Sequence, residues 1–449
     1  MVAVVVVLAS LAGARWLAGC SFSGLLQSLA RLAERPFRNA EFASLLVIGL
    51  LLRIGFSVIY MAPPQSDGAV YLSLADLFLR DAPYQDPRGD LAYWPPGYPM
   101  ILAGFLAVLG KVSWILVISN CVFFILTALA VRSLALQLAG GLTARIAVTV
   151  IALWPNLILT TTGGAKELPA LLFLTVSCVL FLKASRKQGP APLAGIAAGI
   201  ALGAASLIQP SFMLLPAAYA AHLLVQRARL MPAVVLLLSI ALGMALAIAP
   251  WSLRNVAVLH KFVPIATNGG EVFYRANNPL ATGGYIDRGE VDLFVYPEVE
   301  RSALGFALGK QWIRENPGDF ARLAGTKMAL FQGDDAYGAY WCLKRALGIE
   351  GLHYAGYKVV SNLYWLLLWL TLLVLMLRRP AGERLSLGLS LLNLIYLYFF
   401  VIDSIFESGS RHHIPLAGVV AVLVGALLEA EACKKVRPEA QVRLMDVVQ

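Results

Sequence analysis

The sequence has few charged residues, few histidines and no patterned cysteines, and each shortage excludes a class of protein. Only 14% of its 449 residues are charged and 59% are hydrophobic, with five scattered cysteines. A soluble domain of ordinary composition has about 25% charged residues, and these cysteines lack the spacing of a metal site or disulfide framework. The mean hydropathy of +0.74 instead predicts a polytopic membrane protein. The net charge of +10 therefore reflects basic membrane-proximal loops and indicates no nucleic-acid partner.

Apolar runs predict an all-α bundle of ten transmembrane helices with both chain ends in the cytoplasm. The predicted spans are 42–61, 112–137, 145–162, 168–183, 191–207, 211–226, 231–250, 352–377, 385–402 and 414–430. Residues 98–110 are shorter than the roughly 20 residues that a helix needs to cross, so we interpret them as a juxtamembrane or re-entrant helix. Lysine and arginine then cluster in the loops of one side, as cytoplasmic loops do.

This topology divides the chain into three parts and gives it two faces. Residues 1–41 form an N-terminal interfacial or cytoplasmic segment, 42–430 the transmembrane domain and 431–449 a cytoplasmic tail. Residues 62–97, 163–167, 251–345 and 403–413 face outward, with 251–345 forming a cap of mixed loop and helix. We expect a multi-pass protein of the plasma (inner) membrane whose active site faces the periplasm or exterior.

Two features near the N-terminus have competing interpretations. Leu17 to Cys20 resembles a lipoprotein cleavage box, but Arg15 interrupts the apolar run and no basic residues precede it. An interfacial segment or an upstream start therefore accounts for residues 1–20 better. Arg53 lies within the first span, where an arginine marks a functional site or pairs with a neighbouring helix.

The first long polar segment, residues 62–99, follows the first span and is the strongest candidate for an active site. Asp67 and Tyr71 stand one helical turn apart, and Tyr93 to Pro99 close the loop with aromatic and proline residues. A solvated connector is the alternative, with Ser66 or Asp67 acting only as the cap of a helix at 68–79. The other aspartates of the segment are interpreted as solvated or capping groups: Asp76, Asp81, Asp86 and Asp90.

Several short motifs occur in a particular order along the chain. Asp-x-x-x-Tyr begins at Asp67, Pro-Pro-Gly-Tyr-Pro occupies 95–99, and Glu167 precedes Leu-Pro. The series continues with Pro-Trp-x-x-Arg-Asn at 250–255, Asn-Asn-Pro-Leu-Ala-Thr-Gly-Gly at 277–284 and Arg-His-His-Ile-Pro-Leu at 411–416. Over roughly 42–430 the chain thereby resembles the GT-C glycosyltransferases, in the branch of protein O-mannosyltransferases and lipid A aminoarabinose or galacturonosyl transferases.

The resemblance implies an enzyme that transfers a hexose or pentose, with inversion, from a polyprenyl-phosphate-sugar donor to an envelope lipid, glycan or protein. Asp67 and Glu167 match the family's acidic residues, and Arg411 matches the arginine before the last span. Two motifs depart from the pattern: Arg-His-His replaces Arg-Tyr-Arg, and Gln209 stands where relatives often have arginine. These departures leave the identity of the donor sugar open.

The chemistry of the residues agrees with this class of reaction. A carboxylate can accept the acceptor's proton, and a lipid-phosphate leaving group needs cations or hydrogen-bond donors. We therefore predict Asp67 and Glu167 as catalytic residues. The predicted substrate-binding residues are Tyr71, Lys166, Arg254, Asn277, Asn278, Arg411, His412 and His413, of which the two asparagines fit turn formation better than sugar binding.

No metal ligand is assigned and no cofactor is certain, but alternatives remain open for both the metal and the function. A divalent cation shared by Asp67 and Glu167, or ligation by His412 and His413, is the metal alternative. The functional alternatives are a lipid or sugar flippase and an O-antigen ligase or polymerase. A transporter would place its polar residues on broken helices at mid-membrane, whereas this chain concentrates them in its outer loops.

Overall fold

The structure is a computed structural model that describes residues 13–15, 17–19, 22–187, 189–388 and 390–436. Every regular element in these ranges is a helix, which confirms the predicted all-α class. Cys20, and with it the cleavage-box interpretation, lies outside the described residues, as does 437–449 of the predicted tail.

Among the residues that the structure describes, six helical segments are long and apolar enough to cross a membrane, and a bent pair adds a seventh. The six are α3 (Asn39–Ile59), α6 (Ile115–Leu138), α9 (Glu167–Ser185), α12 (Leu230–Leu259), α16 (Gly351–Leu377) and Ile414–Lys434, which contains most of α19 (Ala417–Val436). The bent pair is α7 (Gly141–Leu153) followed by Pro155–Thr162, at 46°. The second member of this pair, Pro155–Thr162, comprises α8 (Pro155–Leu159) and η1 (Thr160–Thr162).

The predicted number of ten spans is not confirmed. The predicted spans 191–207, 211–226 and 385–402 are shorter apolar helices here: α10 (Pro192–Ile208), η2 with α11 (Pro210–Leu214 and Pro216–Val225), and α18 (Leu391–Ile405). Residues 98–110, predicted not to span, form the equally short α5 (Gly97–Leu109). Composition finds the apolar runs, but the turns at Gln209, Pro210 and Pro216 set the helix lengths.

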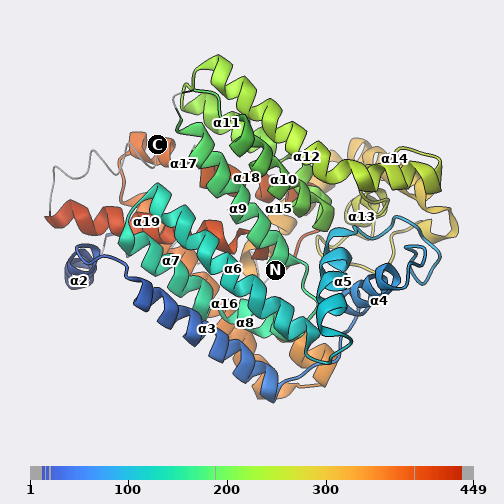
Figure 1. The fold of residues 1–449 in the computed structure, drawn as a ribbon, viewed down its shortest axis with the longest axis horizontal. Coiled ribbons are helices and arrows are strands. Elements are labelled where there is room, and N and C mark those ends of the chain that lie inside the picture. The colour runs from blue at the N-terminus through green and yellow to red at the C-terminus, as the bar shows by residue number, and fades with distance from the viewer. Residues whose placement is uncertain (1–12, 16, 20–21, 188, 389, 437–449) are drawn as a thin grey trace.

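The remaining helices are shorter or less apolar than these spans. They are α2 (Ser23–Ala33), α4 (Asp67–Leu79), α13 (Gly269–Ala276), η3 (Leu293–Val295), α14 (Glu298–Glu315), α15 (Pro317–Gly333), the π-helical η4 (Ala339–Arg345), α17 (Ala381–Gly388) and η5 (Ile414–Leu416). Asn316 separates α14 from α15, at the break that Asn316-Pro317-Gly318 predicts. Figure 1 shows α4, α5, α13 and α14 together at the right, and α2 and α17 at the left.

Small residues allow the central helices to approach one another closely. Gly199 of α10 faces the backbone of Ile240 in α12, and Gly243 of α12 faces Ile196 in α10. A Cβ at either glycine would overlap that backbone, so larger residues would separate the two helices. Such small-residue contacts are typical of helix pairs inside membranes. The bundle beside them provides a rigid support for the loops at its ends.

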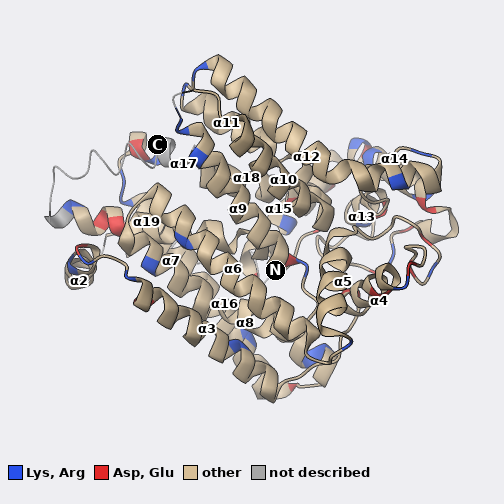
Figure 2. Cartoon of the chain, viewed as in Figure 1, with Lys and Arg blue, Asp and Glu red and all other residues tan. Residues whose placement is uncertain are grey.

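Charged residues gather at the ends of the bundle and leave its middle apolar. Figure 2 shows the long helices almost entirely tan, with blue and red segments near the helix ends and in the region of α4, α13 and α14. Glu167 begins α9, whereas Lys183 and Arg186 lie at its other end. At that other end of the bundle, Arg145 pairs with Glu41 and donates to Leu32 O at 3.1 Å. The basic loops that were predicted to be cytoplasmic thus lie opposite Glu167.

Arg53 within α3 binds a neighbouring helix. Its Nη1 donates to Ala152 O at 3.1 Å and to Gly49 O at 3.0 Å, and its Nη2 donates to Ile151 O at 3.2 Å. The guanidinium also lies 3.8 Å from the ring centre of Phe124. Arg53 therefore satisfies the carbonyls at the bend between α7 and α8, which supports the pairing interpretation over a ligand-binding one.

Candidate functional site

Asp67 is the first residue of α4, and its carboxylate points away from its own helix. Ser66 precedes it with a left-handed φ of 47°, and neither side chain caps the helix through a hydrogen bond. Asp67 Oδ2 instead accepts a hydrogen bond of 2.8 Å from Arg411 Nη1. The interpretation of Asp67 as a helix cap therefore does not describe its contact, which joins residues 344 positions apart.

The second outer segment reaches Asp67 through a close contact of two glycines. Gly68 and Gly164 pack so tightly that a Cβ on Gly68 would lie 3.1 Å from Gly164 Cα. Asn120 of α6 holds this segment by donating to Thr161 O at 2.8 Å and Gly163 O at 3.1 Å. These contacts place Lys166 and Glu167 beside the start of α4.

Arg411 lies between the two predicted catalytic carboxylates. Its Nη1 is 2.8 Å from Asp67 Oδ2, and its Nε is 3.9 Å from Glu167 Oε1. Tyr337 covers the guanidinium with its ring centre 5.8 Å from Arg411 Cζ. Three sequence-predicted residues from three distant segments thus meet in one cluster, with Tyr337 as a fourth member.

The charges of the cluster alter one another's pKa values. Burial alone would raise the pKa of Asp67, but the charge and hydrogen bond of Arg411, with Lys166, hold it below its ordinary value. The pKa of Lys166 is lowered, first by burial and then by Arg411. Burial works against the charge of Arg411, yet Asp67, Tyr337 and Glu167 raise its pKa well above the ordinary value. Asp67 is therefore ionised and Arg411 charged at neutral pH.

Several polar atoms around Glu167 are buried without a hydrogen-bond partner in the structure. They include Glu167 Oε2, Tyr71 Oη and Tyr98 Oη. The two tyrosine rings meet edge to face with centres 5.2 Å apart, and both lie within the electrostatic influence of Glu167. More than about nine in ten buried polar groups in proteins have a partner. These three atoms can therefore still form hydrogen bonds, for example with a ligand.

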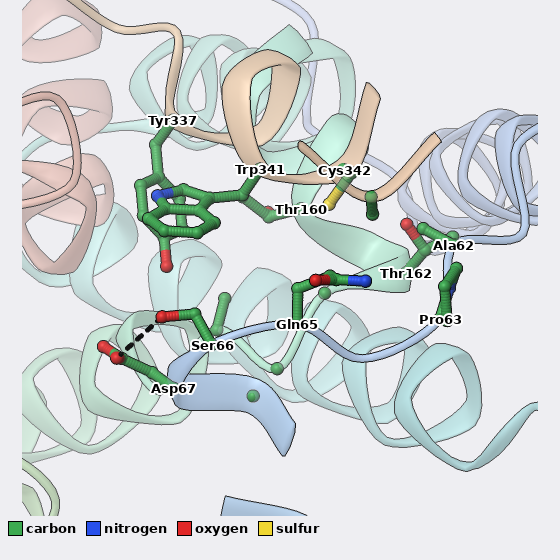
Figure 3. Close-up of a pocket in the computed structure, with 15 residues that line it drawn as sticks. Ala62, Pro63, Gln65, Ser66, Asp67, Thr160, Thr162, Tyr337, Trp341 and Cys342 are labelled. Carbon is green, nitrogen blue, oxygen red and sulfur yellow. Dashed lines mark hydrogen bonds between the residues drawn. The ribbon is translucent and has the colours of Figure 1, made fainter. Parts of the chain in front are cut away.

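A small cavity opens beside Asp67. It has a volume of about 40 Å³, and its walls come from residues 62–68, the 160–165 segment and η4 with its preceding turn. Figure 3 shows Tyr337 and Trp341 projecting from one side toward Ser66 and Asp67 on the other. A polar group of a ligand in this cavity would reach Asp67 directly, whereas Glu167 does not line it.

The donor set at this site does not fit a divalent cation. Among the residues that the structure describes, no group of three or more His, Cys, Asp or Glu side chains is arranged so that it could hold a metal ion. Asp67 and Glu167 are joined through the guanidinium of Arg411. A cation between them would have to displace that guanidinium and would find only two protein carboxylates. The metal alternative for Asp67 and Glu167 is therefore not supported by their geometry.

The other predicted substrate-binding residues lie elsewhere in the outer region. Arg254 donates to Leu91 O at 2.6 Å and Tyr84 O at 2.9 Å, so its guanidinium holds the first outer loop. Asn277 donates to Phe273 O and Ile405 O, and Asn278 donates to Tyr274 O. These contacts support the turn-forming interpretation of the two asparagines.

His412 and His413 follow Arg411 but point away from the cavity. His412 Nδ1 lies 3.4 Å from Asp403 Oδ1. His413 is fully buried, with Nε2 at 2.9 Å from Asp335 Oδ1 and Nδ1 at 3.0 Å from Phe331 O. Its ring stacks on Trp365 at 4.3 Å. Substrate contact by either histidine stays a prediction, because the structure gives both rings protein neighbours.

Sequence reasoning missed the residues that hold the cluster in place. Asp335 accepts hydrogen bonds from Trp154 Nε1 at 2.7 Å and Asn156 Nδ2 at 2.5 Å, besides contacting His413. It thereby ties the Arg411 segment to the helix that precedes Gly163, and Tyr337 follows it by two residues. Adjacent acids at 334–335 inside an apolar chain were the available signal.

Comparison with solved structures shows a fold similar to that of an archaeal oligosaccharyltransferase. The oligosaccharyltransferase of Archaeoglobus fulgidus, crystallised with Zn and sulfate, matches with a TM-score of 0.53 at 13% identity, over 91% of this chain and 51% of that one. The same enzyme with an inhibitory peptide and a dolichol-phosphate gives a TM-score of 0.50 at 14% identity, over 90% and 51%. The chain thus spans about half the length of these proteins. The predicted GT-C fold is confirmed.

A narrower match comes from the sequence. Residues 94–253 match the family described as dolichyl-phosphate-mannose-protein mannosyltransferase. ArnT from Cupriavidus metallidurans, in the apo state, is a further structural match at 13% identity, with a TM-score of 0.38 over 86% of this chain and 76% of that one. No curated protein sequence matches the chain.

Proposed function

We propose that the protein is a membrane glycosyltransferase that transfers a sugar from a polyprenyl-phosphate donor to an acceptor of the cell envelope. The observation that carries the proposal is the convergence of Asp67, Glu167 and Arg411 beside a cavity at one end of an apolar bundle. A carboxylate to accept a proton and a guanidinium to hold a phosphate are the two groups that this reaction needs. Support comes from the mannosyltransferase match and from the dolichol-phosphate bound to the archaeal structural relative.

Arg411 binds the donor's phosphate. Guanidinium groups recognise phosphate through two parallel hydrogen bonds, which an ammonium group cannot reproduce. Lys166 lies close enough to influence the charge of Arg411 and adds a second cation. The donor's phosphate is a monoanion and becomes a dianion when the sugar leaves, so these cations favour the products of bond cleavage more than the donor itself.

Asp67 accepts the proton of the acceptor hydroxyl. The acceptor oxygen forms a bond to the anomeric carbon, the bond between that carbon and the phosphate oxygen breaks, and the proton moves to Asp67. In the ligand-free structure Arg411 binds Asp67 and weakens it as a base by lowering its pKa. When the donor phosphate takes Arg411 as its partner, the pKa of Asp67 rises. Donor binding thus creates the base that the reaction needs.

Glu167 keeps Arg411 in place during this exchange. Its Oε1 is 3.9 Å from Arg411 Nε, on a different nitrogen from the one that binds Asp67. A fixed carboxylate at the first residue of α9 is also favoured by the helix dipole.

Single displacement at the anomeric carbon would invert its configuration. The acceptor is an envelope lipid, glycan or protein, reached from the outer face of the plasma membrane.

A transfer assay with the purified protein tests the proposal. Radiolabelled polyprenyl-phosphate sugars, one hexose and one pentose, are incubated with the protein and an envelope extract, and label is followed from the lipid to the acceptor. The proposal expects transfer that depends on the protein. Movement of the labelled lipid between leaflets of proteoliposomes, with no label leaving the lipid, would instead identify a flippase.

A further inference from the structure

A second cavity lies at the opposite end of the bundle from Arg411. It has a volume of about 260 Å³ and lies among the ends of α6, α9 and α11, the start of α18 and part of α19. Helix α9 connects the two sites, because Glu167 is its first residue and Arg186 is its C-cap. At about 1.5 Å per residue, a helix of 19 residues places the two sites roughly 28 Å apart. This distance approaches the thickness of a bilayer's hydrocarbon core.

The cavity has an apolar interior and a polar rim. Leucine side chains from four helices line the interior: Leu138, Leu182, Leu223 and Leu391. The polar lining residues are Ser185, Arg186, Gln226 and Ser390, of which Arg186 and Gln226 are exposed. Arg186 Nη1 donates to Gln137 O at 2.5 Å, a contact that holds the guanidinium at the edge of the cavity. The cavity therefore matches a molecule with a hydrocarbon part and a polar head.

His222 provides an independent sign that the cavity binds a ligand. The residue is only 7% exposed, lines the cavity, and its Nδ1 is buried without a hydrogen-bond partner in the structure. Its ring packs edge-on against Phe181 with centres 6.0 Å apart, so packing on that side limits its rotation. A buried ring nitrogen without a partner costs free energy unless a ligand or water completes its hydrogen bonding.

The surrounding surface is basic. Lys183 and Lys187 flank Arg186 in sequence, and Arg227 and Arg229 occupy the turn after α11. The turn between α11 and α12 appears blue at the upper left of Figure 2. Basic clusters at the end of a helix bundle attract anionic lipid headgroups.

We propose that this cavity binds an anionic phospholipid of the membrane leaflet opposite the glycosyl-transfer site. An acyl chain enters the leucine-lined interior, the phosphate binds Arg186, and His222 Nδ1 contributes a hydrogen bond to the headgroup or its ester oxygens. The bound lipid contacts α9, α11 and the start of α18 together. The site is distinct from the donor site, because the two lie at opposite ends of α9.

Native mass spectrometry of the purified full-length protein in a neutral detergent tests this assignment. The probe is dioctanoyl phosphatidylglycerol, and dioctanoyl phosphatidylcholine, with the same chains but no net charge, is the comparison. We expect one phosphatidylglycerol to bind with higher affinity than phosphatidylcholine. Loss of a charge-assisted contact in Arg186→Gln should weaken that binding about tenfold or more. Arg38→Gln, which removes the same charge at an exposed position outside the cavity and outside this basic cluster, should leave it nearly unchanged.

Two further variants separate binding from general stability. His222→Leu should lose affinity, and His222→Gln, which keeps a hydrogen-bond donor, should recover part of it. The thermal midpoint of each lipid-free variant shows whether it is folded. Equal binding of both lipids, equal losses in Arg186→Gln and Arg38→Gln, or full competition by inorganic phosphate would each overturn the assignment of an anionic phospholipid.

Discussion

The end of the bundle that is predicted to face outward contains two Asp–Arg pairs that look alike in sequence and differ in what surrounds them. Asp67 pairs with Arg411, and Asp90 pairs with Arg301. The side chains of Asp67 and Arg411 are 28% and 23% exposed, and Asp67 lines a cavity. The side chains of Asp90 and Arg301 are only 12% and 4% exposed. Phe294 and Tyr93 cover the guanidinium of Arg301.

The pKa values of the two aspartates are also shifted in opposite directions from the ordinary value. The pKa of Asp67 is lowered because Arg411 and Lys166 together outweigh burial. The pKa of Asp90 is raised because burial outweighs the attraction of Arg301. As pH falls, Asp90 therefore takes up its proton before Asp67 does. The difference indicates that the Asp90 pair holds the loop together, while the Asp67 pair stays charged and open to a ligand.

The largest difference between the pairs is expected in the rate of transfer. Asp67→Asn should fold normally, because neither pairing partner is deeply buried, but it removes the proton acceptor. Loss of a general base typically costs about 100- to 10,000-fold in rate, which the transfer assay measures directly. Even the weakest general-base effect would leave only about a hundredth of the rate. A variant that keeps more than roughly a tenth of the wild-type rate would therefore show that Asp67 is not the general base.

Asp90→Asn should show the reverse pattern. It leaves Arg301 buried without its counter-charge, and breaking a buried ion pair in this way costs on the order of 3–5 kcal/mol of stability. We expect a clearly lower thermal midpoint in detergent, with the activity per folded molecule largely retained. Asp76→Asn, at a more exposed pair with Lys111, is the matched control and should resemble wild type in both measurements. A fully stable but inactive Asp90→Asn would erase the distinction between the two pairs.

An intermediate effect is expected for Arg411. Replacing it with alanine removes a charge-assisted contact to the donor phosphate, worth on the order of 1.5–3 kcal/mol. Arg411→Lys should restore only part of the affinity, because the ammonium group lacks the planar fork. Equilibrium binding of a polyprenyl phosphate in detergent provides the measurement. Full affinity in the alanine variant would assign Arg411 a purely structural role.

The smallest effect concerns pH. Asp67 must be ionised to accept a proton, so activity falls as pH drops through its pKa. Lys166 helps to lower that pKa, and Lys166→Gln should therefore move the acid limb of the kcat/KM profile to higher pH. Lys111→Gln, in the outer region but paired with Asp76, should not move it. If the acid limb of the profile does not move in Lys166→Gln, Lys166 does not influence the pKa of the group that titrates there.

Sequence patterns predicted three residues that the structure brings together, but not the residues that hold them in place. Asp67, Glu167 and Arg411 were found because each lies next to an apolar run, in a recognisable order of motifs. Arg254 was placed with them because it is an outer-loop arginine, yet carbonyl groups of the first loop occupy it. Sequence gives charge and approximate depth, but it does not show whether a charge already has a partner.

Contacts between residues far apart in the sequence explain the other differences between the sequence-based predictions and the structure. His413 lies two residues after Arg411, and only the structure shows that its ring faces Asp335, 78 residues earlier. Tyr337 comes from a stretch without a periodic pattern, so its position over Arg411 depends on how η4 packs against η1. Helix lengths at α10, α11 and α18 were likewise set by turns that composition does not weigh.

The exchange of Arg411 between Asp67 and the donor phosphate is the central claim, and binding of polyprenyl phosphate to two variants tests it most directly. Titration calorimetry on purified wild type, Asp67→Asn and Arg411→Ala supplies the three affinities. If Asp67 competes with the phosphate for Arg411, Asp67→Asn should bind the lipid at least as tightly as wild type while failing to transfer sugar, and Arg411→Ala should bind it more weakly. Equal loss of affinity in both variants would contradict the exchange.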